Sequence, residues 1–503
     1  MKTQVIIIGA GPTGLALAVQ LQRYNIDFII LERNDATTHL SKAMVVHART
    51  LEIFDQVELA EKAVSLGQPA ERFLLISNGK IKGEVTIGVF GQGLSPYPFA
   101  LILEQKKTEK ILADHLTAVG STIQWGCEVT GFKHSKNIIS VTYKDKSGSE
   151  HAIEGDYMVG CDGASSLIRH QLGFGFSGET QERIFYVADV KMYSPIKHKT
   201  DAWFAMVEKG FALFFPMEGE RHYRVIGTVP DALATKSDIV FTDISPLLKE
   251  QMKVDIDFTE EYWFSTYKVH SRLAESFGKG RCFIAGDAAH IHTPAGGQGM
   301  NTGIQDAYNL AWKMAFVLKG KAAESLLETY SDERKANAIN LLNTTDRLFD
   351  IFAGRGILTN FFRQNILPLI LKLVTSTVFL NRFIFPTLSQ IGINYFHSRL
   401  TLKSKVGNVA AGDRMPWFKI NERSIYDDLK EPTCKLLYFG NGTAQKSEFG
   451  DITQLSINII PEIFGNQTEF YIILRPDNYI SYIGNDWGKI NEALEKMIGK
   501  IGQ

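Results

Sequence analysis

One stretch of the sequence, residues 286–301 (GDAAHIHTPAGGQGMN), holds an unusual concentration of residues that can do chemistry. Its aspartate and two histidines, Asp287, His290 and His292, have the types and spacing of a zinc or iron site. Its glycines indicate something else, because residues without a Cβ let the backbone come close to a flat or phosphorylated ligand. Metal ligation needs no such approach. What the rest of the chain binds must decide between the two interpretations.

A glycine motif near the N-terminus predicts a nucleotide site. The sequence VIIIGAGPTGLALAVQLQRYNIDFIILER predicts a strand over 4–8, a tight turn, a helix to about Tyr24 and a second strand from Phe28 to Leu31. The turn carries G-x-G-x-x-G: one glycine permits the turn, one admits a pyrophosphate to the helix N-terminus, and one lets helix and strand pack closely. These glycines are Gly9, Gly11 and Gly14.

The residue at the end of the second predicted strand strengthens this interpretation. Glu32 stands where a carboxylate binds the ribose hydroxyls of an adenosine, and Arg33 follows it. A glycine-rich turn in another α/β fold is the alternative, but strand, glycines, helix and acid occur here in the required order. The motif does not separate NAD from FAD.

Two further motifs lie downstream, each after an apolar strand. YMVGCDGASSLIRHQLGFGFSG places Asp162 after the first strand, with Arg169 downstream, and GRCFIAGD ends the second strand at Asp287. With three motifs in this order, the chain resembles a class A FAD-dependent aromatic hydroxylase of the p-hydroxybenzoate hydroxylase type. The resemblance covers about residues 3–340 by motifs and the remainder more weakly.

The resemblance implies roles for individual residues. Glu32 would bind the ribose of FAD, Gln105 would lie along the cofactor, Asp287 would bind the ribityl chain, and Asp162 would serve both FAD and the pyridine nucleotide. The implied cofactor-binding residues are Gly9, Gly11, Gly14, Glu32, Arg33, Lys42, Gln105, Asp162, Asp287, Gly299, Met300 and Asn301. The residues expected at the reacting ring, where Pro294 would face its reactive side, are Pro294, Gly297 and Gln298. No metal is expected.

Two positions depart from the family pattern. Lys42 stands where arginine is usual, and Ser165 stands where arginine or histidine is frequent. Lysine can neutralise a phosphate as a point charge but lacks the bidentate guanidinium. Arg49 has two interpretations, a share in the phosphate role or an exposed helix residue.

The glycine turn at 296–299 precedes a predicted helix in TGIQDAYNLAWKMAFVL. Reduced flavin carries negative charge, which the N–H groups of the turn and the positive end of the helix would stabilise. Under this interpretation His290 orders the loop by hydrogen bonds instead of binding a metal. One apolar face of the helix is marked by Ile304, Ala307, Ala311, Met314 and Leu318.

The middle of the chain predicts a substrate domain. Aromatic-rich alternating runs such as AWFAMV, GFALFFPM and HYRVIGTV indicate strands, with part of the surface supplied by residues 70–100. Candidates to line an apolar pocket are Phe185, Trp203, Phe214, Phe215 and Met217. Each of them can equally be core. No substrate base is assigned among His222, Tyr223 and Arg224.

The C-terminal region resembles the thioredoxin-like domain of the larger aromatic hydroxylases. Gly412 to Pro416 resembles the linker before that domain, and CKLLYFG, LSINII and EFYIILRPDNYISYIG predict strands, with a hairpin turn at Asp477-Asn478 and a final amphipathic helix. Cys434 is the one cysteine there, so thiol redox chemistry is not expected.

Composition bounds the remaining possibilities. The chain has 503 residues, 45% of them hydrophobic, and a formal net charge of -1, which argues against a nucleic-acid surface. The four scattered cysteines fit a reducing cytosol, so a cytoplasmic location is expected. The apolar region 350–396 is interrupted by charges, so no stable membrane association is expected. Homo-oligomerisation is left open.

These observations together predict an α/β protein with a Rossmann-type FAD-binding domain, an inserted β-sheet substrate domain and a thioredoxin-like C-terminal domain. The expected divisions are FAD-binding domain, first part (1–175), substrate-binding sheet domain (176–270), FAD-binding domain, second part (271–340), helical connection (341–400) and thioredoxin-like domain (401–503).

The resemblance implies an enzyme that uses FAD, O2 and NADPH or NADH. It would hydroxylate a small electron-rich aromatic, a phenol or a phenolic polyketide, through a flavin C4a-hydroperoxide. The alternatives are a flavin-dependent reductase, a halogenase, disfavoured by the missing tryptophan-x-tryptophan motif, or a non-catalytic FAD- or ligand-binding protein of the same fold.

Overall fold

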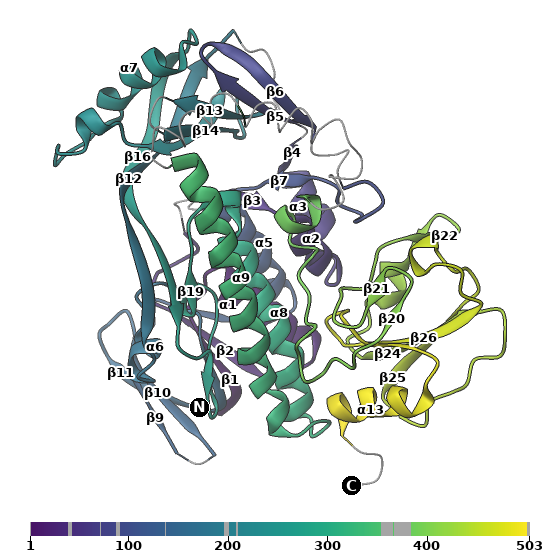
Figure 1. Ribbon diagram of the computed structural model, residues 1–503. Coiled ribbons are helices and arrows are strands. Elements are labelled where there is room, and N and C mark those ends of the chain that lie inside the picture. Colours follow the sequence, from purple (N-terminus) through teal and green to yellow (C-terminus); the bar gives the residue numbers. More distant parts are fainter. Residues whose placement is uncertain are drawn as a thin grey trace.

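The computed structural model has three visible parts: a central sheet with long helices, a second sheet domain beside α7, and a C-terminal domain drawn in yellow (Figure 1). The described residues are 2–38, 43–70, 72–86, 91–135, 137–195, 201–207, 210–353, 366 and 384–499. Residues 354–365 and 367–383 of the expected helical connection at 341–400, and with them most of the apolar region 350–396, therefore lie outside the described ranges. No helix within these ranges is long and apolar enough to span a membrane.

The central sheet has the strand order β17-β18-β11-β1-β2-β8. Neighbouring strands from β18 through β8 pair in parallel. A parallel sheet covered on both faces needs apolar residues at successive positions, and Val5 to Ile8 are accordingly buried without alternation. The strands are β1 (Lys2–Ile8), β2 (Phe28–Glu32), β8 (Ile123–Trp125), β9 (Glu128–His134), β10 (Ile139–Lys144), β11 (Glu150–Gly160), β17 (Gly278–Lys279) and β18 (Cys282–Ile284).

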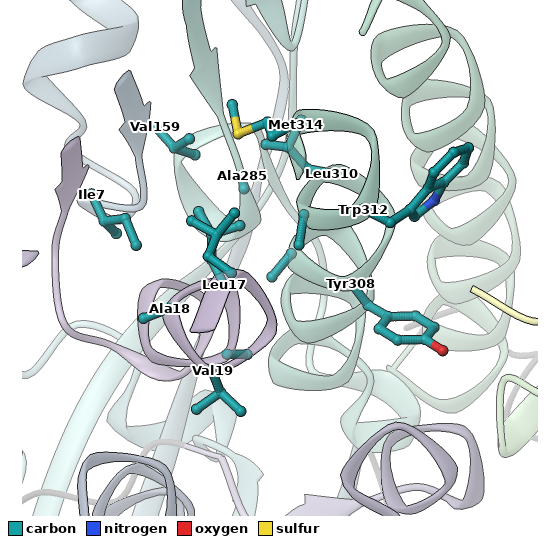
Figure 2. Close-up of a cluster of buried hydrophobic side chains, with 14 of the residues drawn as sticks. Ile7, Leu17, Ala18, Val19, Val159, Ala285, Tyr308, Leu310, Trp312 and Met314 are labelled. Carbon is teal, nitrogen blue, oxygen red and sulfur yellow. The ribbon is translucent and has the colours of Figure 1, made fainter. Parts of the chain in front are cut away.

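Helices α1 and α8 pack together beside this sheet. Figure 2 shows Leu17 and Val19 of α1 in one cluster with Ile7 of β1 and with Leu310 and Met314 of α8. The long helix α8 is buried almost all round because α1 covers one side while α9 and the C-terminal domain contact others. The helices of this part are α1 (Pro12–Arg23), α2 (Ala48–Asp55), α3 (Ala60–Leu66), α5 (Gln105–Ala118), α6 (Leu167–Gln171), α8 (Gly299–Leu318) and α9 (Glu328–Ala353).

The second large sheet has the order β19-β16-β12-β15-β14-β13-β5-β6. The strands predicted at AWFAMV, GFALFFPM and HYRVIGTV are present, and β5 and β6 come from residues 72–86. Helix α7 (Phe241–Met252), which the strand patterns did not predict, covers one face. The strands are β5 (Arg72–Ser77), β6 (Lys80–Thr86), β12 (Phe176–Tyr193), β13 (Ala202–Val207), β14 (Gly210–Pro216), β15 (His222–Thr228), β16 (Asp257–Ala274) and β19 (His290–Ile291).

A small sheet, β3-β7-β4, joins these two parts, with strands β3 (Val45–Val46), β4 (Gln68–Ala70) and β7 (Ala100–Ile102).

The C-terminal domain is a four-stranded mixed sheet, β25-β24-β26-β27, followed by a helix. The strands and the positive φ of Asn478 at the hairpin turn agree with the sequence prediction. The residues between β24 and β25 are all described, and they form no helix. The four cysteines of the chain are buried, and none forms a disulfide. The elements are β24 (Cys434–Gly440), β25 (Ile452–Ile457), β26 (Glu469–Leu474), β27 (Ile480–Gly484) and α13 (Trp487–Ile498), preceded by two short hairpins, β20 (Lys405–Val406) with β21 (Val409–Ala410) and β22 (Lys419–Ile420) with β23 (Arg423–Ser424).

Candidate FAD-binding and active site

The motifs found in the sequence meet at one edge of the central sheet. In the parallel register Ile8 pairs with Leu31 and with Gly160, and Gly160 pairs with Ile284. The residues that follow these strand ends are therefore level with one another: the glycine turn, Glu32, the Asp162 motif and the Asp287 motif. The carboxyl edge of an open parallel sheet is where such folds bind ligands.

The first glycine turn has the shape of a dinucleotide cradle. A Cβ on Gly14 would lie 2.0 Å from the carbonyl oxygen of Gly9, and one on Gly9, whose φ is +102°, would lie 2.5 Å from the carbonyl oxygen of Cys161. A Cβ on Gly11, by contrast, would meet nothing within 4 Å. Gly11 is also the N-cap of α1 and offers no side-chain cap. Open space in front of free helix N–H groups fits a pyrophosphate.

The residues expected near the adenosine end of FAD differ in burial and in hydrogen bonding. Glu32 is buried and its carboxylate accepts hydrogen bonds from the backbone N–H groups of Ala10 (2.7 Å) and Asn34 (2.9 Å), so it also holds the turn together. Arg33 is exposed. Gln105 begins α5 and accepts from the N–H of Ala43 at 3.1 Å. Lys42 lies outside the described residues.

Asp162 has one carboxylate oxygen committed and one available. Oδ2 accepts the N–H of Ile168 at 3.2 Å, whereas Oδ1 is buried without a hydrogen-bond partner among the described residues. Buried polar atoms are rarely left unpaired, so Oδ1 is suited to a ligand. Nearby, buried Arg169 donates to the carbonyl oxygens of Ala288 (3.0 Å) and Ala164 (2.9 Å) and thereby ties the two downstream motifs together. Ser165 is exposed.

The loop that carries Asp287 is held from behind by a residue that sequence analysis missed. Asp306 of α8 is fully buried and accepts from the N–H of Gly286 (3.0 Å), from Nε2 of His290 (2.7 Å) and from Nε of Arg334 (2.6 Å). Burial alone would raise the pKa of Asp306, but the charges of His290 and Arg334 hold it below its usual value. The available sequence signal was an aspartate within the predicted helix that follows the second glycine turn.

This arrangement bears on the metal interpretation of the opening stretch. His290 Nε2 is engaged by Asp306, and His292 Nδ1 lies 2.7 Å from the carbonyl oxygen of Thr293. Within the described ranges no group of three or more His, Cys, Asp or Glu side chains is arranged to hold a metal ion. Asp287 itself is exposed at the sheet edge.

The second glycine turn is fixed by Asn301, the third residue of α8. The Asn301 side chain accepts from the backbone N–H of His47 (2.9 Å) and donates to the carbonyl oxygens of Val45 (2.8 Å) and Gly297 (3.0 Å). His47 Nε2 lies 2.8 Å from the carbonyl oxygen of Gly296. Asn301 is thus a supporting residue, fully buried behind the turn.

The turn itself is exposed at Gly296. Gly296 and Gly297 have φ of +79° and +63°, and Pro294 is exposed. Gln298 is the N-cap of α8 but its side chain points away from the cap, donating instead to the carbonyl oxygens of Thr387 and Leu388 at 3.3 Å. The N-terminal N–H groups of a long helix therefore have no side-chain cap, which suits an anionic ring. The remaining candidates, Gly299 and Met300, begin α8 and are half-buried.

Two buried histidines at this turn predict a pH dependence of stability. Burial lowers the pKa of His47 and of His292 to about 4, below the unfolded value of 6.5. The unfolded chain therefore binds more protons than the folded chain between about pH 6.5 and pH 4, and stability present above pH 6.5 is lost as the pH falls through that window. We expect His47→Gln to remove about 3 kcal/mol of this acid loss at pH 4.

Urea unfolding of the two proteins across this pH window checks the expectation. Gln keeps a donor near the position of Nε2, and His292 stays in place as an internal reference. An unchanged pH slope would mean that burial does not keep His47 neutral.

Arg49 is buried, which corrects the interpretation of an exposed helix residue. It is 3% exposed, pairs with Glu52 at 3.1 Å and donates to the carbonyl oxygen of Asp477 at 3.1 Å. Its ring contacts are with Tyr308 and Tyr479. Arg49 connects α2 to the C-terminal domain.

The five predicted substrate-lining residues separate onto two faces of the second sheet. Trp203 and Phe214 are fully buried in the cluster that packs against α7, so this placement does not support a pocket role for them. Phe215 and Met217 lie on the opposite face in a cluster with Val45 of the small joining sheet and with Met44, which precedes that strand. The fifth residue, Phe185, is fully buried in a neighbouring cluster with Phe211 and Val269.

The three polar candidates on β15 each contact other parts of the protein. Arg224 is buried and forms a two-point ion pair with Asp189, at 2.6 and 2.7 Å. Tyr223 packs in the α7 cluster, and His222 Nδ1 lies 3.0 Å from the carbonyl oxygen of Glu218. None of the three is assigned as a substrate base.

A parallel sheet with a glycine cradle and acidic loops at its carboxyl edge defines a dinucleotide-binding α/β protein, and here a second sheet lies beside that sheet. A family model described as FAD binding domain matches residues 2–345. The chain belongs to this family of class A FAD-dependent aromatic hydroxylases and is an FAD-dependent monooxygenase.

Relatives and solved structures agree over almost the full length. The chain is 30% identical over 509 residues to a flavin-dependent monooxygenase of Mycobacteroides abscessus, covering 98% of this chain and 100% of that one. It is 30% identical over 539 residues to pentachlorophenol 4-monooxygenase of Sphingobium chlorophenolicum, covering 98% and 96%. The structure of OxyS anhydrotetracycline hydroxylase from Streptomyces rimosus matches with a TM-score of 0.79 and 26% identity, covering 99% and 100%.

Proposed function

We propose that this FAD-dependent monooxygenase hydroxylates a small electron-rich aromatic, a phenol or a phenolic polyketide, at the expense of O2 and NADPH or NADH. One oxygen atom of O2 is inserted into a ring C–H bond, which becomes C–OH. The other oxygen atom is reduced to water by the two electrons of the nicotinamide. FAD supplies the chemistry that connects the nicotinamide to oxygen. The protein contributes binding, orientation and exclusion of water.

One observation carries the proposal: an apolar face of the second sheet meets the glycine turn. A Cβ on Gly297 would lie 3.1 Å from Val45 Cβ, and Val45 shares a hydrophobic cluster with Phe215, Met217 and Met44. The backbone turn expected at the flavin ring is therefore adjacent to the face expected to hold the aromatic. A dry apolar wall there protects oxygen chemistry from water.

The names of relatives support the substrate class. One is named for pentachlorophenol, and others are named for 6-methylpretetramide and anhydrotetracycline. Two of the five candidate lining residues, Phe215 and Met217, lie on the face beside the turn and are apolar, as a flat aromatic requires.

Adjacent phenylalanines on opposite faces of β14 provide a matched prediction. We expect Phe215→Leu to raise KM for the aromatic about 10-fold, because a change in a substrate pocket is felt in binding. Phe214→Leu should lower the free energy of unfolding by about 1 kcal/mol while KM is unchanged, because Phe214 packs on Trp203 at a ring-centroid distance of 5.3 Å. Steady-state kinetics with urea unfolding distinguishes them. Equal changes of KM in the two variants would show that Phe215 does not line the substrate pocket.

The proposal is tested on the purified, FAD-loaded protein. NADPH and NADH oxidation, oxygen uptake and product mass are measured across a panel of phenols and phenolic polyketides. We expect nicotinamide oxidation to be slow alone, to accelerate with the right aromatic, and to yield a product heavier by one oxygen atom. Nicotinamide oxidation without oxygen in any product would favour a reductase, and no oxidation would favour a non-catalytic FAD-binding protein.

A further inference from the structure

A line of buried polar contacts runs from the Asp287 loop towards the C-terminal domain. Asp306 holds the loop through the N–H of Gly286 and through His290. Arg334 of α9 donates to the other oxygen of Asp306 at 2.6 Å and, through NH1, to the hydroxyl of Tyr395 at 3.1 Å. The side chains of Asp306 and Arg334 therefore connect the loop to the side chain of Tyr395.

Tyr395 is held by the C-terminal domain. Its backbone N–H donates to the carbonyl oxygen of Gly412 at 2.8 Å. Its ring lies 4.4 Å, centroid to centroid, from Tyr479, and the guanidinium of Arg475 lies 4.6 Å from the ring centroid. Arg475 also forms a two-point ion pair with Glu333, the neighbour of Arg334 in α9, at 2.7 and 3.0 Å. The domain thus contacts α9 beside Arg334 as well as the tyrosine that Arg334 binds.

Burial fixes the geometry of the contacts between Asp306, Arg334 and Tyr395. Asp306 and Arg334 are fully buried, and Tyr395 is 5% exposed. A buried guanidinium that loses a protein partner has no water to replace that partner, and an unpaired buried charge is costly, so its donors hold their partners in one geometry. The positions of Asp306 and hence of the Gly286 N–H depend on Arg334, and that of Arg334 depends in part on Tyr395.

We propose that the C-terminal domain positions the Asp287 loop for FAD through Tyr395, Arg334 and Asp306. These are positioning residues, and the inference rests on the assignment of Asp287 to the cofactor, not on turnover. The domain is then a part of the flavin site although it begins more than a hundred residues after the loop along the chain. No thiol chemistry is required of it.

The test compares two tyrosines of one aromatic stack. Tyr395→Phe removes only the hydroxyl that Arg334 binds, and Tyr479→Phe removes a hydroxyl that has no hydrogen-bond partner in the described part of the chain. Hydrogen exchange of the residue 286–291 amides is measured in the full chain without FAD, and FAD affinity is measured by fluorescence titration. Neither measurement depends on catalysis, so failure of the proposed hydroxylation would be seen separately.

We expect Tyr395→Phe to speed exchange of the Gly286 amide and to weaken FAD binding, each by about 2- to 30-fold, the range of couplings carried through such networks. Tyr479→Phe should change neither. Arg334→Lys keeps a charge facing Asp306 but cannot reach Tyr395 at the same time, and should exceed the effect of Tyr395→Phe. If Arg334→Lys does not fold, the tyrosine pair decides. Unchanged loop exchange, or unchanged FAD affinity, in Tyr395→Phe overturns the proposal.

Discussion

Gly14→Ala will abolish retention of FAD and destabilise the chain. The added methyl would stand 2.0 Å from the carbonyl oxygen of Gly9, and a backbone atom cannot rotate away as a side chain can. Alanine favours a helix by about 1 kcal/mol over glycine, but forcing atoms into a packed contact costs about 1–3 kcal/mol or more. The helix must move from the strand, which displaces the N–H groups that face the pyrophosphate. We expect at least roughly 100-fold weaker FAD binding.

Gly11→Ala is the matched control, three residues away in the same turn. Its methyl meets no protein atom within 4 Å, and its φ of -72° suits any residue. The free energy of unfolding without FAD should therefore stay within about 1 kcal/mol of the original. FAD binding should still weaken, because the methyl occupies the space in front of the helix. Urea unfolding and FAD titration separate the two variants. Full FAD affinity in Gly11→Ala would place the pyrophosphate elsewhere.

Asp287→Ala will weaken FAD binding about 10- to 150-fold with little effect on folding. A carboxylate that accepts a ligand hydroxyl makes a charge-assisted hydrogen bond of roughly 1.5–3 kcal/mol. Asp287 is exposed at the end of β18, so no core packing is lost with its side chain. Asp287→Asn keeps an acceptor without the charge, so its FAD affinity should lie between those of the original protein and Asp287→Ala. The measurements are FAD affinity and thermal unfolding of the FAD-free protein.

Glu32→Ala provides the contrast, because the Glu32 carboxylate has structural work as well. Removing it leaves the buried N–H of Ala10 without its 2.7 Å partner, which costs about 1–3 kcal/mol of stability in the absence of FAD. Both FAD affinity and FAD-free stability should fall. If Asp287→Ala and Glu32→Ala both retained FAD through gel filtration, the assigned orientation of the cofactor would be wrong.

The sequence alone was sufficient for the features that depend on local pattern. Tight turns need glycine, buried parallel strands need continuous apolar runs, and alternating aromatic runs form strands. The glycine cradle, the central strands and strands β13, β14 and β15 were therefore predicted in place. The order of the three motifs then indicated the family. These signals are carried by neighbours in the chain and do not require knowledge of distant contacts.

Tertiary structure decided which side chains face the ligand and which support it. Alternation along β14 shows that Phe214 and Phe215 face opposite ways but not which face α7 covers. Asn301, predicted to bind the cofactor, donates to the carbonyl oxygen of Val45, and Arg49 donates to the carbonyl oxygen of Asp477 in the C-terminal domain. Asp306 and Arg334 carried no local motif, because they are 28 residues apart and meet only when α8 and α9 pack. The role of a buried charge depends on such a partner, because a buried charge is costly unless it is paired. The partner is known only from the folded chain.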